Sequence, residues 1–396
     1  MFYFIIYLIL SACSVRYVNI PRSNSRYRIT LFFILLGFIL ISGLRYEIGV
    51  DYFNYVRHFN ESETIYELLS TNSSFLTNIV LGWEPGCILL FSFTKTIFKE
   101  PQSIFLISSL ICSILLFKAM KYFNEDKYLF FSLLIYFCFV YMYQEMHALR
   151  QALGATIFYY GLTKNNSVKS MLIYTALSGC FHYSLWLFIP IVFFIKKTMA
   201  RKLEFIILSS AVLVFFLRIP WMNGAINILA SVSHEFGIIS RIVGYTDNDE
   251  FSRPFFFTFI LYLLPYIFLM YSKYKSKIVF DQKTNIAWNL YFLYLVFTML
   301  FWEFSFFSIR YGWICLFGMA VILPRFIGIF KNKFIPISYI IVFSFLPIRT
   351  FLFPDLTTAQ FSPYENYISR VILQNKGTGR ERAIRYLSEN GKSLKE

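Results

Sequence analysis

Charged side chains are scarce in this sequence. Asp, Glu, Lys and Arg make up 15% of the 396 residues, whereas they account for about a quarter of a soluble globular protein. Hydrophobic residues reach 57% and aromatic residues 21%. Such an apolar excess has to face lipid. The composition therefore excludes a soluble enzyme and predicts an integral membrane protein.

Residues that bind metals are also few and poorly spaced. The 4 histidines and 6 cysteines form no CxxC, HxxxH or HExxH motif, the spacings that hold zinc in many proteins. Most of the cysteines fall within apolar stretches, where we expect buried thiols. These absences predict that the protein binds no metal ion.

Long apolar stretches are what the sequence has instead. Many run for roughly 15 to 20 residues, about the length that a helix needs to cross the hydrocarbon core. They lack the alternation of barrel strands, and a helix satisfies its own backbone in lipid. We therefore predict an all-α, polytopic transmembrane helical bundle of about 12 spans. The expected spans are residues 2–15, 29–44, 101–118, 128–146, 151–163, two within 171–195, 203–217, 254–271, 285–303, 311–329 and 334–347.

Short basic loops set the predicted topology, because cytoplasmic loops hold the excess of Lys and Arg. The basic loops are residues 16–28, 118–127, 164–169, 196–202, 273–283 and 325–333. Placing them inside leaves the long loops 44–83 and 218–253 outside. Residues 1–348 then form a single transmembrane domain, and the polar tail 349–396 lies outside, partly ordered to about residue 370. Alternatively, the tail lies inside and residues 85–98 form a true span.

Two segments depart from simple spans. The apolar block 85–98 is short and carries Lys95, so we expect a re-entrant helix, or one lying in the interface, on the outer side. Residues 171–195 have to cross twice, which places a bend at Phe181-His182-Tyr183-Ser184. Broken helices survive at membrane depth where protein or a watery cavity satisfies the backbone. We expect this bend to line a cavity that opens outward.

Every cation of the two long outer loops is an arginine. These residues are Arg45, Arg57, Arg218, Arg241 and Arg253. The planar guanidinium makes paired bonds to phosphate or carboxylate, which an ammonium cannot do. The pattern predicts an outer site for an anionic substrate that carries pyrophosphate. Alternatively, these arginines pair with acids of the same loops or anchor to lipid headgroups.

Further polar residues stand at the ends of apolar blocks, where charge is costly and often marks function. Arg150, Arg310 and Glu84 all lie near the predicted outer boundary. The alternative is that each side chain reaches the interface from a helix end without a further role. Residues 43–55 are the densest mixture of aromatic and charged residues, and Asp51 and Tyr55 share one helical face. Such mixtures hold sugars, although aromatic residues also gather at any membrane interface.

Taken in order, these motifs resemble the EpsG-like branch of the Wzy-type polysaccharide polymerases, over about residues 1–370. The motifs are Arg45-x3-Gly49-x-Asp51-Tyr52-x2-Tyr55, Gly82-Trp83-Glu84-Pro85-Gly86, Arg150-Gln151-Ala152-Leu153, Phe181-His182-Tyr183-Ser184 and Arg310. A tryptophan stands at 83 where tyrosine is usual. Neither long loop shows the Arg-x10-Gly pattern of some Wzy proteins.

The resemblance implies a multi-pass glycosyltransferase of GT-C-like architecture in the bacterial inner membrane. Such enzymes polymerise O-antigen or capsule units by moving the growing glycan from undecaprenyl pyrophosphate onto a new lipid-linked repeat unit. Pyrophosphate is a good leaving group that fixed cations stabilise, so no metal, nucleotide or other cofactor is expected. The implied partners are the undecaprenyl-pyrophosphate-linked oligosaccharide, membrane lipid and a chain-length co-polymerase. No nucleic acid is expected.

The resemblance also assigns roles to residues. Arg45, Arg150 and Arg310 are expected to hold the pyrophosphate, and an acidic residue is expected to remove the proton of the acceptor hydroxyl. The predicted catalytic residues are Asp51, Glu84 and, as second choice for the base, His182. The predicted substrate contacts are Arg45, Tyr52, Tyr55, His147, Arg150, Gln151, Arg241 and Arg310.

Two other functions compete with a polymerase. An O-antigen ligase uses the same donor on the same face but delivers the glycan to lipid A-core. A flippase or other transporter of lipid-linked oligosaccharide has charged groups near the middle of its spans and short loops on both faces. The polar residues here gather at the outer boundary beside long loops, which favours an enzyme.

Overall fold

The protein is described by a computed structural model, which covers residues 1–70, 72–80, 82–222, 257–275, 280–303, 305–354, 356–374 and 377–389. All named elements in these residues are helices, so the all-α prediction is confirmed. The chain divides into two compact units, which are described separately. Unit 1 is Met1–Phe193 with Asn332–Glu396, and unit 2 is Phe194–Lys331. The single domain predicted for residues 1–348 stays a prediction.

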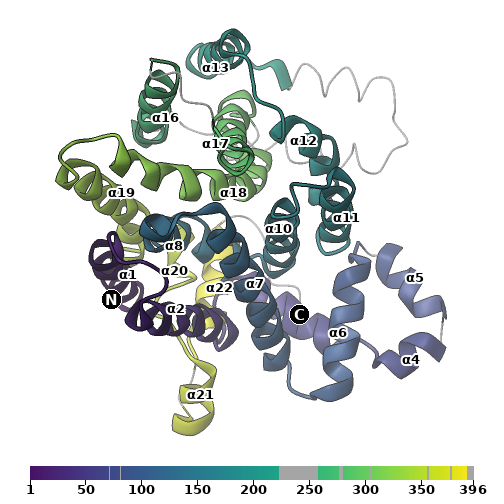
Figure 1. Ribbon diagram of the computed structural model, residues 1–396. Helices are drawn as coiled ribbons and strands as arrows, with labels where there is room; N and C mark the ends of the chain where they lie inside the picture. Colours follow the sequence, from purple (N-terminus) through teal and green to yellow (C-terminus); the bar gives the residue numbers. More distant parts are fainter. Residues whose placement is uncertain are drawn as a thin grey trace, which may run out of the picture. The chain divides into compact units, whose positions relative to one another are not determined.

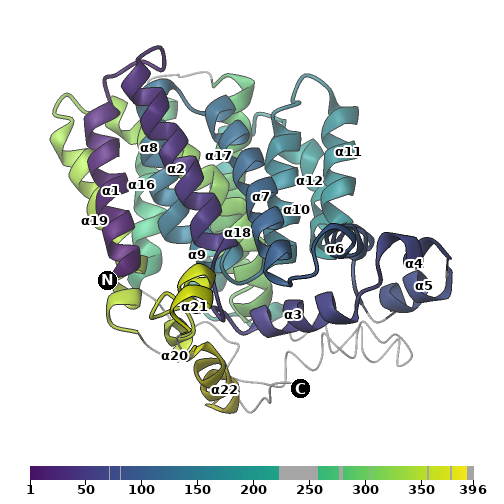
Figure 2. The same cartoon turned by 90° about the horizontal axis from the view of Figure 1, so that it is seen from below.

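Long helices run side by side in unit 1 and stand upright in the view of Figure 2. They are α1 (Phe2–Tyr17), α2 (Ser25–Gly43), α7 (Gln102–Phe123), α8 (Leu129–Tyr136), α10 (Leu149–Leu162), α11 (Val168–Gly179) and α19 (Phe334–Leu352). A π-helical turn (Phe137–Tyr141) and α9 (Met142–Gln144) continue α8. Such turns are frequent near functional sites.

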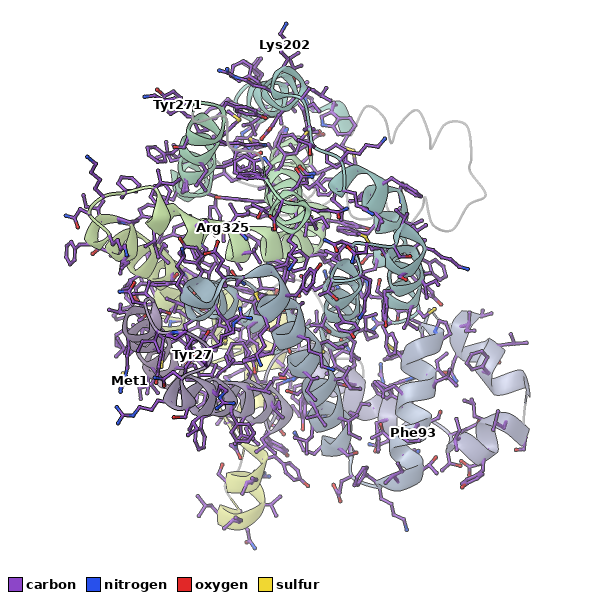
Figure 3. All side chains as sticks on the ribbon, in the orientation of Figure 1. Met1, Tyr27, Phe93, Lys202, Tyr271 and Arg325 are labelled. Carbon is purple, nitrogen blue, oxygen red and sulfur yellow. The ribbon has the colours of Figure 1, made fainter. Side chains whose placement is uncertain are left out.

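Several of these helices are suited to a membrane. Four are long and apolar enough to cross one: Ser25–Gly43, Gln102–Phe123, Arg310–Gly328 and Phe334–Leu352. Shorter apolar helices are Phe2–Tyr17, Pro85–Ile97, Leu129–Gln144 and Tyr183–Ile195. Figure 3 labels two contrasting side chains, Phe93, which is 53% exposed, and Tyr27, which is fully buried. Large apolar side chains at the surface fit a helical membrane bundle, whereas the count of 12 spans stays a prediction.

Short helices gather at one end of unit 1. They are α3 (Asp51–Glu61), α4 (Ile65–Ser70), α5 (Asn72–Val80), α6 (Pro85–Ile97), α20 (Leu356–Ala359), α21 (Tyr367–Leu373) and α22 (Gly379–Glu389). Figure 2 shows α3, α20 and α22 at the lower end of the upright helices. The backbone N–H of Tyr46 donates to the Glu365 carbonyl at 3.0 Å, and that of Tyr367 to the Leu44 carbonyl at 2.8 Å. The C-terminal tail and the loop 44–83 therefore share one end of the unit, and the side of the membrane on which they lie stays a prediction.

The charge within the apolar block 85–98 has a structural partner. Lys95 of α6 donates to the carbonyls of Asn60 and Ser62, at 2.6 and 2.5 Å. Because the last carbonyls of a helix lack partners within it, a cation there satisfies them. Lys95 thus caps the end of α3 and fixes α6 against it. Whether α6 is re-entrant stays a prediction.

The bend predicted within residues 171–195 is present in the structure. α11 ends at Gly179, and a 3-10 turn (Tyr183–Leu187) leads into α12 (Phe188–Ile195). Gly179 permits this return, because a Cβ there would lie 1.6 Å from the Trp186 side chain. The bend thus brings Phe181 and His182 to the end of α11.

Unit 2 contains α13 (Arg201–Phe216), α16 (Phe257–Lys275), α17 (Gln282–Leu300) and α18 (Ser305–Ile322). α17 and α18 approach closely at Gly318, where a Cβ would lie 2.4 Å from the Ala287 carbonyl oxygen. Glu204 is fully buried and accepts hydrogen bonds from Trp288, Tyr266 and Tyr274. Lys273 lies 3.5 Å from the same carboxylate. This sealed, paired charge ties α13, α16 and α17 together.

Candidate functional site

The turn into α3 brings an acid and a histidine together. Gly49 has φ +81°, and a Cβ there would lie 3.1 Å from His147 Nδ1, so the position favours glycine for two reasons. Asp51 follows as the first residue of α3, where the helix dipole favours an acid. Its Oδ2 lies 3.7 Å from His147 Nε2. The two side chains remain 29% and 18% exposed, so a substrate can reach this pair.

The starts of α6 and α10 are joined by a second pair. Arg150 is the second residue of α10, and Glu84 stands just before Pro85, which begins α6. Arg150 Nη1 and Glu84 Oε2 are 2.6 Å apart. The carboxylate is 5% exposed, whereas the arginine side chain is 29% exposed. Glu84 therefore holds the guanidinium from the protein side and leaves part of it open.

Two rings extend this pair into a stack. Arg150 Cζ lies 4.7 Å from the Trp83 ring centroid, a cation–π distance. The ring of His58, on α3, stacks on Trp83. The two ring centroids are 3.4 Å apart, and the angle between the ring planes is 5°. We call His58, Trp83 and Arg150 the arginine stack. Burial first, and then Arg150 and Arg57, lower the pKa of His58 to about 4, so its ring is neutral at pH 7.

The bend at residues 181–184 docks onto this region. Tyr183 Oη donates to the Trp83 carbonyl at 3.0 Å, and the Gly86 N–H donates to the Cys180 carbonyl at 2.8 Å. A Cβ on Gly154 would lie 3.5 Å from His182 Cβ. Since Gly154 follows Arg150 by one helical turn, His182 borders the α10 face on which Arg150 lies. His182 Nδ1 is 2.6 Å from Ser184 Oγ.

Some predicted substrate contacts lie in the protein core. Tyr52 stacks on Phe105 at 4.6 Å and bonds Gln102, and Tyr55 belongs to the same hydrophobic cluster. Tyr52 is 6% exposed and Tyr55 3% exposed, while Gln151 is fully buried. These side chains support α3 and α10 from beneath. They do not line an open surface in this structure.

Arg45 is also enclosed by protein. Its side chain is 0% exposed, and Nη1 donates to the carbonyls of Ser42 and Glu145, both at 2.9 Å. Its Cζ lies 4.7 Å from the Phe105 ring centroid. The guanidinium thus joins the end of α2 to the segment between α9 and α10.

With this geometry in place, the chain can be compared with known proteins. A family model described as the EpsG family matches residues 28–366. The chain belongs to the EpsG family. No curated protein and no solved structure matches it. Family membership suggests a polysaccharide polymerase-like function for this membrane protein.

Not every predicted site residue of this EpsG-family protein falls in unit 1. Arg310 lies on α18 of unit 2, and Arg241 lies outside the described residues. Within unit 1, the structure pairs Glu84 with Arg150, places His182 beside Gly154 one turn further along α10, and pairs Asp51 with His147. Among the described residues, no three His, Cys, Asp or Glu side chains could hold a metal ion. The expected absence of a metal stays a prediction.

The sequence analysis overlooked two members of the arginine stack. His58 was not singled out, although residues 51, 55 and 58 share one helical face, a spacing that points to it. Trp83 was noted only as a departure from the family pattern, although it precedes Glu84 directly. Both side chains could have been found by asking what holds Arg150 and Glu84 in place.

Proposed function

We propose that this EpsG-family protein polymerises lipid-linked repeat units of O-antigen or capsule at the outer face of a bacterial inner membrane. The bond from the glycan's anomeric carbon to undecaprenyl pyrophosphate breaks, and a glycosidic bond to the acceptor hydroxyl forms. The acceptor proton passes to a base, and undecaprenyl pyrophosphate leaves. The observation that carries the proposal is the partly exposed Arg150, held in the arginine stack at the end of unit 1 where Asp51 pairs with His147.

Arg150 is the proposed ligand of the leaving pyrophosphate. Its Nη1 is occupied by Glu84 and its Nε is buried, but 29% of the side chain stays exposed. A guanidinium has five N–H donors, so this arrangement keeps donors for an anion. Charge that develops on the leaving group is best stabilised by a cation that is already fixed in place. Glu84 and Trp83 supply that fixation.

Asp51, together with His147, is the proposed base. Glu84 is less suited, because its carboxylate is nearly buried and already binds Arg150. The Asp51 side chain is 29% exposed, and His147 Nε2 lies 3.7 Å from its Oδ2, within ion-pair distance but beyond a hydrogen bond. His182 remains the second choice, since its Cβ lies near Gly154, one helical turn after Arg150 on α10.

The proposal keeps the finer expectations of the family resemblance. Arg310 and Arg241 are further proposed substrate ligands. The architecture is GT-C-like with about 12 spans, and catalysis needs no metal or nucleotide. A chain-length co-polymerase is the proposed partner.

The decisive experiment gives the purified protein a defined lipid-linked repeat unit. We expect a ladder of longer lipid-linked glycans, without added metal or nucleotide. Complementation in cells separates a polymerase from a ligase. Loss of a polymerase leaves a single repeat unit on lipid A-core, whereas loss of a ligase leaves lipid A-core without any repeat unit. A transporter would move the substrate without making a glycosidic bond. Absence of chain extension with the correct repeat unit would refute the proposal.

A further inference from the structure

Two helices at one end of unit 1 run across the long helices instead of along them. Figure 1 shows α6 lengthwise and α1 end-on, whereas Figure 2 shows α6 end-on and α1 upright. α3 also lies across the upright helices in Figure 2. The long helices give the direction in which this membrane protein crosses the bilayer. α3 and α6 therefore run along the plane of the membrane.

The surface of α6 is the reverse of a water-facing helix. Its most exposed side chains are Leu89, Phe93 and Ile97, which are 46%, 53% and 56% exposed. Since each follows the last by four residues, they form one stripe along the helix, which we call the α6 stripe. Ser92 and Thr94, by contrast, are 1% and 0% exposed. A helix that buries its hydroxyl groups and exposes large apolar side chains is suited to hydrocarbon.

α3 has the surface expected of a helix that faces water. Its apolar side chains are turned inward, with Tyr55 3% and Phe59 0% exposed. Its exposed residues are Asn54, Asn60 and Glu61. The two crosswise helices lie at the same end of unit 1, yet one exposes polar groups and the other apolar groups. This contrast indicates that α3 faces water and α6 faces lipid.

The α6 stripe has the same pattern as the exposed side of the helix that follows. α7 is long and apolar enough to span a membrane, and α6 packs against it. Leu106, Leu110 and Ile114 of α7 are 38%, 43% and 37% exposed, again four residues apart. The exposed apolar side of a spanning helix has to face lipid. The α6 stripe therefore continues a surface that lipid covers.

The neighbouring short helices extend this apolar surface. In both Figure 1 and Figure 2, α4 and α5 lie on the side of α6 away from α7. Tyr66 and Leu69 of α4 are 75% and 74% exposed, and Leu76 and Val80 of α5 are 61% and 82% exposed. A segment that extends sideways from the ends of spanning helices lies over the bilayer. Lipid is therefore the partner that fits these side chains.

We propose that α6 lies flat in the membrane interface, with the α6 stripe against the acyl chains of the bilayer and α3 on the watery side. The arginine stack forms where the two helices meet, because Trp83 and Glu84 directly precede α6 and His58 belongs to α3. Lipid contact thus holds Arg150 at the depth of lipid phosphate groups. The inference does not depend on the proposed function, since it concerns the seating of the protein in lipid.

The test measures the depth of single nitroxide labels on the full chain in vesicles of phosphatidylethanolamine and phosphatidylglycerol. The partly exposed Cys13 and Cys180 are replaced by serine, and the remaining cysteines are buried. One label at a time is attached through Leu89→Cys, Phe93→Cys or Ile97→Cys. Collisions with oxygen, which enters lipid, are compared with collisions with a water-soluble nickel chelate. The ratio of the two gives the depth of the label.

We expect all three labels of the α6 stripe to collide more with oxygen than with the chelate, and to lie at one depth. A helix that enters the bilayer along its axis would separate residues 89 and 97 by about 12 Å in depth, at about 1.5 Å per residue. Asn54→Cys on α3 is the matched control and should collide more with the chelate. Leu110→Cys on α7 should lie deeper than the α6 stripe.

The same measurements can overturn the inference in different ways. More collisions with the chelate than with oxygen at Phe93→Cys would place the α6 stripe in water. A change in depth of about 12 Å between residues 89 and 97 would show that α6 is re-entrant or spans the membrane. Few collisions with either reagent would mean that protein covers the stripe, such as a second copy of the chain.

Discussion

Arg45 and Arg150 carry the same side chain in the same unit, yet their surroundings differ. Arg45 has no exposed surface, and its Nη1 bonds backbone carbonyls that lie on two segments of the chain. Arg150 is 29% exposed, and its Nη1 binds the carboxylate of Glu84. Each guanidinium also lies over an aromatic ring, Phe105 for Arg45 and Trp83 for Arg150.

The difference separates a structural cation from one available to a ligand. Carbonyls hold Arg45 inside the protein, where it joins two segments. Glu84 and Trp83 hold Arg150 and leave part of it exposed. The sealed pair of Lys273 and Glu204 in unit 2, 6% and 0% exposed, resembles the first arrangement. Exposure together with fixation distinguishes a candidate catalytic cation, because a fixed donor reorganises little as charge develops.

The largest effect is expected from Arg150→Lys. An ammonium cannot make the paired bonds of a guanidinium to pyrophosphate, so chain extension should fall by about 10²–10³-fold. The amount of protein in the membrane should stay normal, because the positive charge beside Glu84 is kept. The measurement is the rate of extension by purified protein, with polymer length in cells as a second readout.

Arg57→Lys is the matched control for this change. Arg57, on α3, is 36% exposed, with its Nε 4.0 Å from Glu61, and it should tolerate lysine. Normal long-chain polymer in Arg150→Lys would contradict the role of Arg150 and remove the contrast with Arg45.

Arg45→Met should act on stability instead. The change removes two hydrogen bonds from a charged group to buried carbonyls and should lower the free energy of unfolding by about 3 kcal/mol. Protein that remains folded at low temperature should still extend chains. Thermal unfolding in detergent, together with the donor KM of the folded fraction, checks both points.

One result would contradict the assignment of Arg45 as a purely structural cation. Arg45 Nε and Nη2 are buried without a hydrogen-bond partner among the described residues, so only a rearrangement of the protein would make them available to a ligand. A stable Arg45→Met protein with a raised donor KM would show that Arg45 binds pyrophosphate, as the sequence analysis expected.

The contrast between the two arginines could not be predicted from sequence. Hydrophobic stretches and basic loops predicted the apolar helices and the bend at residues 181–184, because those signals are local. The burial of Arg45 depends on the Glu145 carbonyl, 100 residues away, and the docking of α22 on a bond that spans 333 residues. Neither contact produces a periodic pattern in the sequence. The family motifs pointed to Glu84 and Arg150, but they did not predict that the two side chains form an ion pair.

A smaller effect should follow from His58, whose ring stacks on Trp83. Its pKa falls from 6.5 to about 4 in the folded protein, chiefly through burial. Between these values the unfolded chain binds a proton that the folded protein does not. His58 therefore destabilises the fold as pH drops from 6.5 toward 4, and has no such effect above 6.5.

The size of this effect can be isolated by mutation. Between pH 7 and pH 5 the wild type should lose about 2 kcal/mol more stability than His58→Phe, which keeps a ring but cannot titrate. Thermal unfolding at both pH values gives the double difference. Equal pH dependence in the two proteins would mean that His58 is solvated and that the stack does not exclude water.

The smallest effect is expected at Trp83, and it decides what holds Arg150 in place. Trp83→Tyr keeps a π face under the guanidinium and should change the rate by less than about twofold, whereas Trp83→Leu should lower it by about fivefold, as loss of a cation–π contact predicts. Glu84→Gln provides the comparison, because it weakens the ion pair and leaves the ring. If Trp83→Leu matches Arg150→Lys in its loss of rate, the ring fixes the guanidinium. If Trp83→Leu extends chains at the wild-type rate, Glu84 alone is sufficient to hold the Arg150 guanidinium in place. Arg150 then differs from Arg45 only in its exposure and in having a carboxylate partner.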